Sequence, residues 1–359
     1  MDYRIDMTTV LKLKAFGSLI SEVIRPGLCT GCGACVASCP VLALTMKGEQ
    51  PAIIDRCINC GICYYQCPET SYSIEEFEKS IFGRVRRDDE PFGVYKSCFT
   101  ARALNPDVRK VGTDGGFVTA LLLYMMDNGK IDGAVICSKS NTELWKAEPK
   151  VAVNRDEIIN NAGTKYTVCP MILGLSNAVR DLGKKSVAFV GTDHTIVAVR
   201  KSQLIKNEYW GLGGYVKLTI GLFCMECFSN RLLKEYIPNK GVDLSKITKF
   251  HITRGRFIIY SGDEVLLKAP IKELDPYVLQ SCHKCLSLTA ELADISVGGI
   301  GSEPGWTTVI IRSEQGEKFF NEALNAGYIE AKPLPTEGFN TVVKSSTFKR
   351  KKATESSGA

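Results

Sequence analysis

Eight cysteines arranged in two copies of one spacing constrain this chain more than any other feature. The first copy begins at Cys29 and reads Cys-Thr-Gly-Cys-Gly-Ala-Cys-Val-Ala-Ser-Cys-Pro, and the second repeats the spacing Cys-x2-Cys-x2-Cys-x3-Cys-Pro from Cys57. Two-residue gaps let a tight loop curl round three corners of a cube, while Gly31, Gly33 and Gly61 permit left-handed or crowded backbone. The proline that ends each copy turns the chain away.

This spacing is typical of the bacterial-type ferredoxin module, in which three thiolates hold one [4Fe-4S] cluster and the fourth crosses to the other cluster. A pair of zinc knuckles would instead show two Cys-x2-Cys pairs with a longer separation and no third cysteine. We therefore predict a ferredoxin domain with two [4Fe-4S] clusters at residues 27–75. The predicted ligands are Cys29, Cys32, Cys35 and Cys67 for cluster I, and Cys57, Cys60, Cys63 and Cys39 for cluster II.

The composition otherwise describes a soluble globular protein kept inside the cell. Fifteen cysteines in 359 residues favour metal or redox use, because a reducing compartment does not sustain a disulfide framework. The apolar run 118–126 is shorter than the roughly 20 residues of a bilayer-spanning helix, and residues 1–7 lack the layout of a secretory signal. We expect a cytoplasmic protein without a transmembrane segment, whose association with the inner face of the membrane would come through a partner.

Residues on either side of the cysteine motif suggest further segments. Apolar positions at helical spacing predict a leader helix within residues 1–26, and a charged linker follows the ferredoxin domain at 76–93. Residues 346–359 are polar and basic and are predicted to form a disordered tail. The leader helix and the tail are candidate docking elements for a partner, while the mild net charge of +6 gives no reason to expect a nucleic-acid partner.

Residues 94–345 alternate strand-like and helical runs, which predicts a larger domain of α/β or α+β class. The predicted strands are 133–137, 186–190, 218–224, 257–260 and 308–312. The predicted helices are 116–128, 171–182, 195–204, 229–237 and 315–326.

The larger domain contains seven more cysteines. Two pairs, Cys224 with Cys227 and Cys282 with Cys285, have two-residue gaps that favour a metal or a cluster over a redox disulfide. We predict a third [4Fe-4S] cluster here, with zinc and a dithiol as the alternatives. The others occur singly in apolar or strand-like surroundings that favour packing roles; they are Cys98, Cys137 and Cys169.

Short glycine-rich loops beside predicted elements suggest a ligand site. Gly115 and Gly116 lead directly into an apolar helix, where backbone amides suit a phosphate, although the spacing matches neither the Walker nor the Rossmann fingerprint. The loops at 161–166 and 190–195 would line a cleft at strand ends or else form ordinary turns.

Six motifs together carry a resemblance to a known family. They are Asp114-Gly-Gly-Phe-Val-Thr-Ala-Leu-Leu, Ile131-Asp-Gly-Ala-Val, Ala162-Gly-Thr-Lys-Tyr, Gly221-Leu-Phe-Cys, Cys282-His-Lys-Cys-Leu and Ala293-Asp-Ile-Ser-Val-Gly-Gly-Ile-Gly. In this order they resemble the family of beta subunits of coenzyme F-420 hydrogenases and dehydrogenases. With the ferredoxin module in front, the chain is most similar to the F-420H2 dehydrogenase input-subunit branch of methanogenic and related archaea.

The resemblance implies an FAD site and a [4Fe-4S] cluster in residues 94–345, with coenzyme F-420 docking against the flavin. A deazaflavin gives up two electrons as a hydride, whereas iron-sulfur clusters accept one electron each. A flavin that handles both must therefore stand between them.

One departure from the family pattern affects the third cluster. The family usually has Gly-Thr-Pro-Cys-Gln where this chain has residues 191–195, so His194 replaces an expected cysteine ligand. Cys224, Cys282 and Cys285 survive by direct match, and the fourth ligand could be His194, Asp193 or Cys227. A second departure, Gly299 where relatives often carry aspartate, weakens any role for that loop.

The resemblance also implies cofactor contacts. Lys165 is the expected counter-charge for the flavin or its phosphates, and Arg200 and Lys201 are expected either to meet the anionic tail of F-420 or to be ordinary helix-surface residues. No catalytic side chain is expected, because bound FAD would carry the hydride. The expected contacts are Asp114, Gly115, Gly116, Thr119, Gly163, Thr164, Lys165, Tyr166, Gly191, Thr192, Arg200 and Lys201.

The leading functional hypothesis is an oxidoreductase subunit that transfers hydride between F-420 and FAD and passes single electrons through [4Fe-4S] clusters to or from a partner redox complex or ferredoxin. One alternative is the F-420-reducing beta subunit of a formate dehydrogenase or hydrogenase. Another is an electron-relay adaptor without flavin chemistry.

Overall fold

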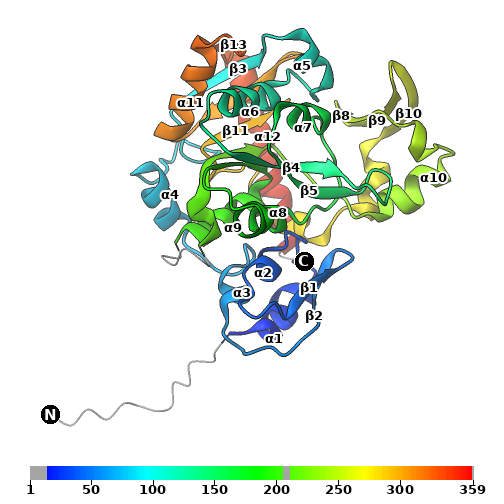
Figure 1. Cartoon of the computed structure of the whole chain (residues 1–359). Helices are drawn as coiled ribbons and strands as arrows, with labels where there is room; N and C mark the ends of the chain where they lie inside the picture. The colour runs from blue at the N-terminus through cyan, green and yellow to red at the C-terminus, as the bar shows by residue number, and fades with distance from the viewer. Residues whose placement is uncertain (1–13, 205–210, 358–359) are drawn as a thin grey trace.

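A small cysteine-rich module lies beneath a larger domain in the computed structural model, which describes residues 14–204 and 211–357 (Figure 1). The larger domain is built on an eight-stranded mixed sheet, and a separate three-stranded sheet projects from one side (Figure 1). This is the predicted order of a cysteine-rich module followed by a mixed α/β domain.

The cysteine-rich module is a pair of short helices and a hairpin around its thiols. Gly33 and Gly61 adopt left-handed φ values of 81° and 80° and begin the two helices, which is where glycine costs least. The elements are α1 (Phe16–Leu19), which continues into a π-helical turn (Ile20–Ile24), α2 (Ala34–Ala37), β1 (Leu44–Lys47), β2 (Gln50–Ile53) and α3 (Ile62–Tyr65).

The predicted leader helix is part of this module. Phe16, Leu19 and Val23 are buried in one cluster with Cys39 and Cys63. One face of the described part of the leader therefore belongs to the core of this module. Residues 1–13 lie outside the described residues.

The predicted linker at 76–93 begins inside a helix. Helix α4 (Ile74–Phe82) is capped at its start by Ser73, whose Oγ accepts the Glu76 N–H at 3.1 Å. A capping serine before two glutamates is a helix-start signal, and the charged composition of the segment concealed it.

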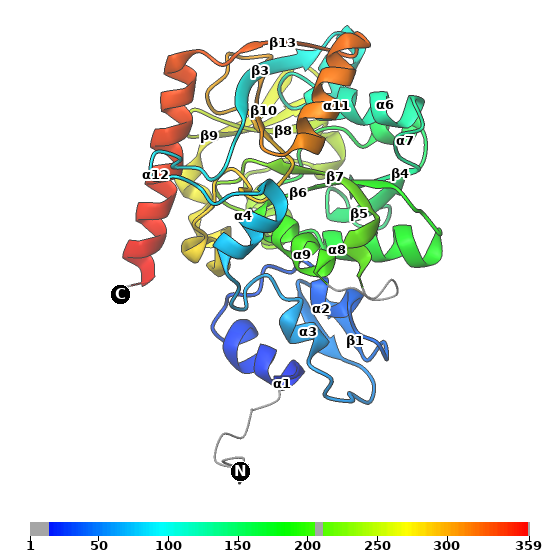
Figure 2. The same cartoon turned by 90° about the vertical axis from the view of Figure 1, so that its left-hand side faces the viewer.

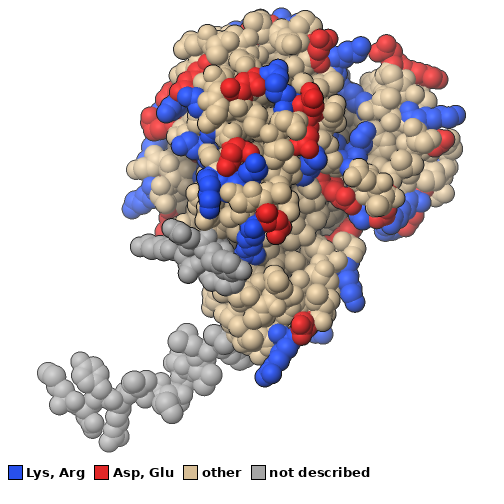
Figure 3. All heavy atoms as spheres, viewed as in Figure 1, with Lys and Arg blue, Asp and Glu red and all other residues tan. Residues whose placement is uncertain are grey.

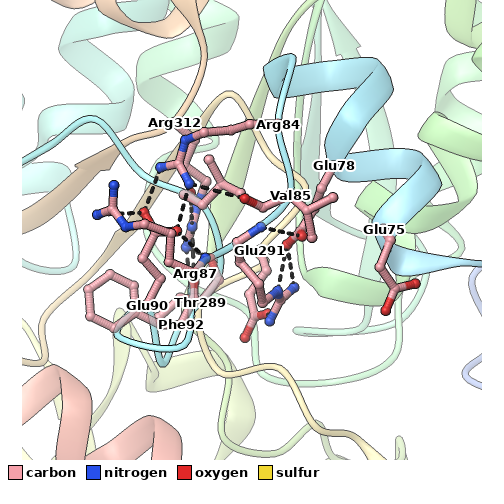
Figure 4. A network of polar contacts seen from close by, with 12 residues as sticks. Glu75, Glu78, Arg84, Val85, Arg87, Glu90, Phe92, Thr289, Glu291 and Arg312 are labelled. Carbon is pink, nitrogen blue, oxygen red and sulfur yellow. Dashed lines mark hydrogen bonds and ion pairs between the residues drawn. The ribbon is translucent and has the colours of Figure 1, made fainter.

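The arginines after α4 form ion pairs with buried carboxylates (Figure 4). Arg84 donates to Glu90 at 2.7 and 2.5 Å, and the Glu90 side chain is fully buried. Arg86 bridges Glu78 and Glu291, each at 2.6 Å. The segment between the two modules is thereby fixed to the larger domain.

Arg312 ties the same segment to the sheet from within. Its side chain is 1% exposed, and it donates to the Phe92 and Val94 carbonyls at 3.0 and 2.7 Å. It also donates to Ser296 Oγ at 2.7 Å. A further bond goes to Thr289 Oγ1 at 2.9 Å (Figure 4). These bonds satisfy groups that would otherwise be buried without partners.

The eight-stranded sheet contains four of the five predicted strands, and its central neighbours β4, β6, β7 and β11 run parallel. In spatial order its strands are β13 (Ile329–Pro333), β3 (Ser97–Ala103), β12 (Thr307–Ile311), β11 (Ile295–Gly298), β7 (Val216–Leu222), β6 (Val187–Gly191), β4 (Gly133–Lys139) and β5 (Ala147–Ala152).

Helices cover both faces of this sheet. Alternate strand residues divide between two cores, with Ala134 and Ala188 on one face and Val135 and Val187 on the other. The first face packs against α6 (Phe117–Asp127) and α11 (Glu314–Asn325), and the second packs against α8 (Met171–Ser176) and α9 (Asp193–Gln203). The cysteine-rich module adds Cys32, Ala34 and Ala37 to the second core.

The predicted helices and strands are confirmed within a few residues. Shorter elements include α5 (Pro106–Val111), α7 (Arg155–Asn160), α10 (Ile237–Asn239), π-helical turns at Asn177–Asp181 and Leu232–Tyr236, and 3-10 turns at Leu212–Tyr215, Leu244–Lys246, Ile271–Tyr277 and Gln280–Lys284. The three-stranded sheet comprises β10 (Glu264–Pro270), β9 (Arg256–Ser261) and β8 (Lys249–Thr253). Across the described residues, no helix has the length and hydropathy that crossing a bilayer requires.

Residues 346–357 of the predicted disordered tail are instead helical, and residues 358 and 359 lie outside the described residues. Helix α12 (Thr336–Ser357) lies along one side of the larger domain (Figure 2). Its buried positions are spaced by three and four residues and so form one helical face: Gly338, Val342, Ser346, Lys349 and Ala353. The prediction failed because the buried face is partly polar, so the basic composition concealed its period.

Replacing Arg312 with methionine should lower the free energy of unfolding by roughly 2 kcal/mol or more, because the Phe92 and Val94 carbonyls lose their buried donor. Urea denaturation of anaerobic protein, followed by circular dichroism, measures the change. Lys332→Met is the control, since that lysine is 50% exposed and its ion pair with Glu303 is long, at 4.0 Å. Equal stability losses in the two variants would contradict the role given to Arg312.

Candidate functional site

The first four thiols that come together belong to different copies of the motif. Burial raises the pKa of Cys35, and the thiols of Cys32, Cys67 and Cys29 raise it further. Cys32 is likewise buried, and Cys67 makes the largest charge contribution to its raised pKa. We call these four residues the first tetrad. Its membership matches the predicted ligand set of cluster I.

The other four thiols of the motif form a second tetrad. Burial raises the pKa of Cys63 to about 12, with further contributions from Cys60, Cys57 and Cys39. All four line one hollow, and Cys60 is exposed. Buried thiols crowded together resist ionisation unless a cation is present, so both tetrads suit the iron of a cluster.

Lys201 joins the first tetrad to the larger domain. From α9, its Nζ donates to the Cys67 carbonyl at 2.6 Å and to the carbonyl and hydroxyl of Thr70 at 3.0 and 2.9 Å. The residue is 6% exposed, and burial lowers its pKa to about 8. Neither a surface position nor contact with a bound anionic tail fits these contacts, so the expectation for Lys201 is corrected.

Arg200 is also buried, but it faces the sheet. Its guanidinium lies 3.2 Å from Asp294 and donates to the Leu292 carbonyl at 2.8 Å and to Thr219 Oγ1 at 3.0 Å. These partners compensate the charge of Arg200 inside the fold. The expected contact with F-420 is therefore corrected for Arg200 as well.

The larger domain contains a third tetrad. Cys224 follows β7, and its thiol contributes to the raised pKa of Cys227, Cys282 and Cys285. The Cys227 N–H also donates to Cys282 Sγ at 3.2 Å. The two predicted cysteine pairs thus converge, and Cys227 lies with the other three.

Lys349 brings a positive charge from α12 to the third tetrad. Its Nζ donates to the carbonyls of Cys224 and Ser287 at 2.6 and 2.8 Å. Burial alone would lower the pKa of Lys349, but the thiols of Cys285 and Cys224 hold it above its ordinary value. A cation in this place offsets the negative charge of thiolates.

Asp193 and His194 lie at the start of α9, on the Lys349 side of the third tetrad. Burial raises the pKa of Asp193, whose neighbours include Ser287, Glu291 and Lys349. Burial lowers the pKa of His194 to about 4, and the charge of Lys349 adds to the effect. The surroundings therefore favour the neutral form of both side chains.

The loop of Gly191 and Thr192 serves the same helix start. A Cβ on Gly191 would lie 2.1 Å from Thr195 Oγ1, so the turn requires glycine. Thr192 precedes α9, and its hydroxyl lies 3.4 Å from the His194 ring. These contacts place the loop beside the third tetrad.

The other two predicted loops meet each other. Thr113 Oγ1 lies 2.7 Å from Thr164 Oγ1 and accepts the Thr164 N–H at 2.8 Å. Lys249, from β8, donates to the carbonyls of Gly112 and Thr113 at 3.2 Å. Two loops that are distant in sequence are thereby held under the projecting sheet.

Asp114 completes this group of polar side chains. Its Oδ1 lies 3.6 Å from His251 Nε2, and a Cβ on Gly299 would lie 2.8 Å from its Oδ2. Gly299 thus leaves room for the Asp114 carboxylate. We call the group the loop cluster: Thr113, Asp114, Thr164, Lys249 and His251.

Gly115, Gly116 and Thr119 contribute mainly to packing. A Cβ on Gly115 would lie 2.8 Å from Arg102 Cβ, and one on Gly116 would lie 2.8 Å from the Val108 carbonyl. The Gly115 N–H already donates to Thr307 Oγ1 at 3.1 Å, and Thr119 is buried in α6. The amide of Gly115 is therefore not available to a phosphate.

Lys165 and Gly163 shape their own loop. Lys165 Nζ donates to the carbonyls of Ala162 and Gly163 at 3.3 and 3.0 Å, and Gly163 has a φ of 88°. Burial lowers the pKa of Lys165 to about 8. The lysine is thus held at the loop cluster by its own turn.

Tyr166 connects the loop cluster to the third tetrad. Its hydroxyl accepts the Ile252 N–H at 3.2 Å, and its carbonyl lies 3.6 Å from Cys227 Sγ. Burial raises the pKa of Tyr166, and both Asp114 and Cys224 contribute. The residue therefore spans the distance between the two groups.

Sequence reasoning missed several polar residues of these sites. Lys249 and His251 occupy alternate positions of one strand, a signal that could have marked them as one face of β8. Lys349 could have been recognised from its place in the buried face of α12. Thr113 gave no signal, since its contact depends on tertiary structure.

Models of known protein families match both the cysteine-rich module and the larger domain. Residues 98–175 and 184–337 match models described as the N-terminal and C-terminal parts of the coenzyme F420 hydrogenase/dehydrogenase beta subunit. Residues 21–79 match a 4Fe-4S dicluster domain.

Curated relatives come from methanogenic archaea. The coenzyme F420 hydrogenase subunit beta of Methanothermobacter thermautotrophicus is 37% identical over 73% of this chain and 93% of its own length. An F(420)H(2) dehydrogenase subunit of Methanosarcina mazei is 30% identical over 92% of each chain. A chain in the structure of the F420-reducing [NiFe] hydrogenase complex from Methanosarcina barkeri is 33% identical, with a TM-score of 0.71 over 76% of this chain and 94% of that chain.

Lys201→Met should speed the loss of iron from the dicluster module by about tenfold or more, because its hydrogen bonds to Cys67 and Thr70 contribute roughly 1.5–3 kcal/mol. The loss of visible absorbance after an iron chelator is added measures the rate. Lys217→Met, at an exposed position of β7, is the matched control. Indistinguishable rates would show that Lys201 does not stabilise the module.

Proposed function

The chain belongs to the family of coenzyme F420 hydrogenase/dehydrogenase beta subunits and carries a 4Fe-4S dicluster domain, and from this premise we propose that it transfers hydride between coenzyme F420 and FAD and passes single electrons through three [4Fe-4S] clusters. Its partner in this role is a redox complex or ferredoxin. When bound, FAD exchanges an electron pair with F420 and single electrons with clusters.

One observation carries the proposal: the loop cluster and the three tetrads form a continuous series. Tyr166 adjoins both the loop cluster and the third tetrad. On the far side, Asp193 interacts with Cys285 and with Glu69, which is next to the first tetrad. Cys35 and Cys63 then link the first and second tetrads electrostatically. Such a series suits electron transfer between a hydride site and a surface.

The loop cluster supplies groups suited to a phosphate-bearing ring cofactor. Lys249 of the loop cluster and the neighbouring Lys165 provide positive charge, and the hydroxyls of Thr113 and Thr164 provide donors. The Asp114–His251 pair adds a polar contact that can orient a ring. Orientation and exclusion of water are what hydride transfer between two ring systems requires.

A partner is proposed to dock where the second tetrad approaches the surface. Large apolar side chains are exposed there. In Figure 3 the visible face of the cysteine-rich module carries few charges, in contrast to the larger domain above it. Apolar surface of this kind favours protein contact. The residues are Val41, 40% exposed; Leu42, 70%; Ile54, 59%; Ile58, 57%; and Tyr65, 60%.

Two relatives support different candidate roles. The alignment with the F(420)H(2) dehydrogenase subunit covers 92% of both chains, including the region of the dicluster module, and this favours the dehydrogenase-type input subunit. The higher identity of 37% to a hydrogenase beta subunit supports the second candidate, an F420-reducing beta subunit.

When reduced F420 is mixed with anaerobically purified protein, the flavin absorption should bleach first. The iron-sulfur absorption should then fall more slowly. The sequence of events follows from the order of the sites. Stopped-flow spectra measure it, with oxidised F420 as the control. Iron-sulfur absorption without flavin bands would instead support the electron-relay adaptor.

Cys227→Ser should remove about four of twelve irons per chain, since each cube contains four, whereas His194→Ala should retain them. The Cys227 N–H donates to Cys282 Sγ at 3.2 Å, within the third tetrad, whereas the His194 ring has the Thr192 hydroxyl as its partner at 3.4 Å. Iron quantification with electron paramagnetic resonance measures both variants. Loss of iron in His194→Ala alone would make histidine the fourth ligand.

A further inference from the structure

Two lysines are buried in the described part of the chain, and each bonds to the backbone of a tetrad cysteine. Lys201 is 6% exposed and donates to the Cys67 carbonyl of the first tetrad at 2.6 Å. Lys349 is 5% exposed and donates to the Cys224 carbonyl of the third tetrad, also at 2.6 Å. Burying a lysine is costly unless its surroundings compensate the charge. The repeated placement therefore indicates that the buried charge serves the tetrads.

Lys349 also joins the two segments that carry the third tetrad. We call residues 224–227 and 282–287 the two cysteine loops. The bond from Lys349 Nζ to the Cys224 carbonyl reaches the first loop, and the bond to the Ser287 carbonyl at 2.8 Å reaches the second. One side chain thus holds the backbone of both loops.

Neighbouring positions of α12 fix the helix in this place. Arg350 pairs with Glu291 at 2.5 Å, and Lys352 pairs with Glu226 of the first cysteine loop at 2.6 Å. These two basic residues face carboxylates, whereas the hydrogen bonds of Lys349 to Cys224 and Ser287 go to neutral carbonyls. Lys349 therefore brings a positive charge to the third tetrad in a position that the fold determines.

Two buried hydroxyls at the same contact have no hydrogen-bond partner among the described residues. Ser281 directly precedes Cys282 and is 5% exposed. Ser346 is 1% exposed and lies three residues before Lys349 on the buried face of α12, which packs against Gln280–Lys284. Buried hydroxyls ordinarily have partners. These donors fit a group rich in hydrogen-bond acceptors, as the sulfurs of a [4Fe-4S] cluster are.

We propose that Lys349 is a positioning residue that holds the two cysteine loops together and raises the reduction potential of the [4Fe-4S] cluster of the third tetrad. The proposal rests on the third cluster of the proposed function. The step concerned is a one-electron reduction, with the electron supplied by the flavin of that function. Reduction adds one negative charge, which a fixed positive charge nearby stabilises relative to the oxidised state.

The place of the third tetrad gives this shift a consequence. Tyr166 connects the tetrad to the loop cluster, so in the proposed function this tetrad receives electrons directly from the hydride site. A raised potential at the first acceptor favours the transfer of a single electron away from the reduced flavin. Lys349 would thus favour the separation of the electron pair.

A redox titration of the anaerobic full chain tests the charge of Lys349. At the wild-type midpoint, Lys349→Met should lower the ratio of reduced to oxidised third cluster about tenfold, which is a shift of about 59 mV for one electron. Electron paramagnetic resonance measures the ratio, and the third-cluster signal is the one that Cys282→Ala removes. Lys344→Met, at an exposed position of α12, is the matched control and should leave the midpoint unchanged.

Amide hydrogen exchange of the same samples tests the hold on the two cysteine loops. Peptides that cover 224–227 and 282–287 should exchange about tenfold faster or more in Lys349→Met, because two hydrogen bonds to their carbonyls are lost. Lys349→Gln retains a donor without the charge, so it should lower the midpoint with a smaller effect on exchange. It also gives the midpoint if Lys349→Met fails to retain the cluster.

The outcomes separate this proposal from the proposed function. An unchanged third-cluster midpoint in the Lys349 variants, with about twelve irons per chain retained at four per cube, would overturn the proposal and leave the electron-transfer function intact. Exchange of the cysteine loops at the wild-type rate in Lys349→Met would also overturn it. About eight irons in the wild-type protein, with no signal lost in Cys282→Ala, would overturn the proposal together with the third cluster of the proposed function.

Discussion

Crowding of thiols in buried places is the constraint around which this molecule is built. Each tetrad gathers groups that repel one another once they ionise, so the ionised form of each is favoured by positive charge nearby. Lys201 and Lys349 supply such charge from different helices, α9 and α12. The fold thus brings distant segments together at the sites where negative charge would accumulate.

The parallel strands determine where the larger domain concentrates its chemistry. The carboxyl ends of β4, β6 and β7 share one edge, and they lead to Cys137, Asp193 and Cys224. Residues far apart in the chain therefore meet along that edge. The cysteine-rich module packs against helices α8 and α9 of the larger domain. This packing fixes the position of one module relative to the other.

Local spacing predicted the membership of the first two tetrads, since the motif itself brings the thiols within one small loop system. The same reasoning identified the main strands and helices. It failed for Arg200 and Lys201, because adjacent helical positions point in different directions and only the tertiary structure shows that one meets Asp294 and the other Cys67. The prediction of a disordered basic tail failed for a different reason, because one buried lysine among exposed lysines does not change the composition of the segment.

The helix that carries Lys349 has a consequence for biosynthesis. Every cysteine of the third tetrad precedes α12 in the chain, so all four thiols leave the ribosome before the lysine that covers their carbonyl edge. Until that helix forms, the tetrad stays open on one side. Docking of the final helix therefore completes the surroundings of the third tetrad only after its four thiols have been synthesised.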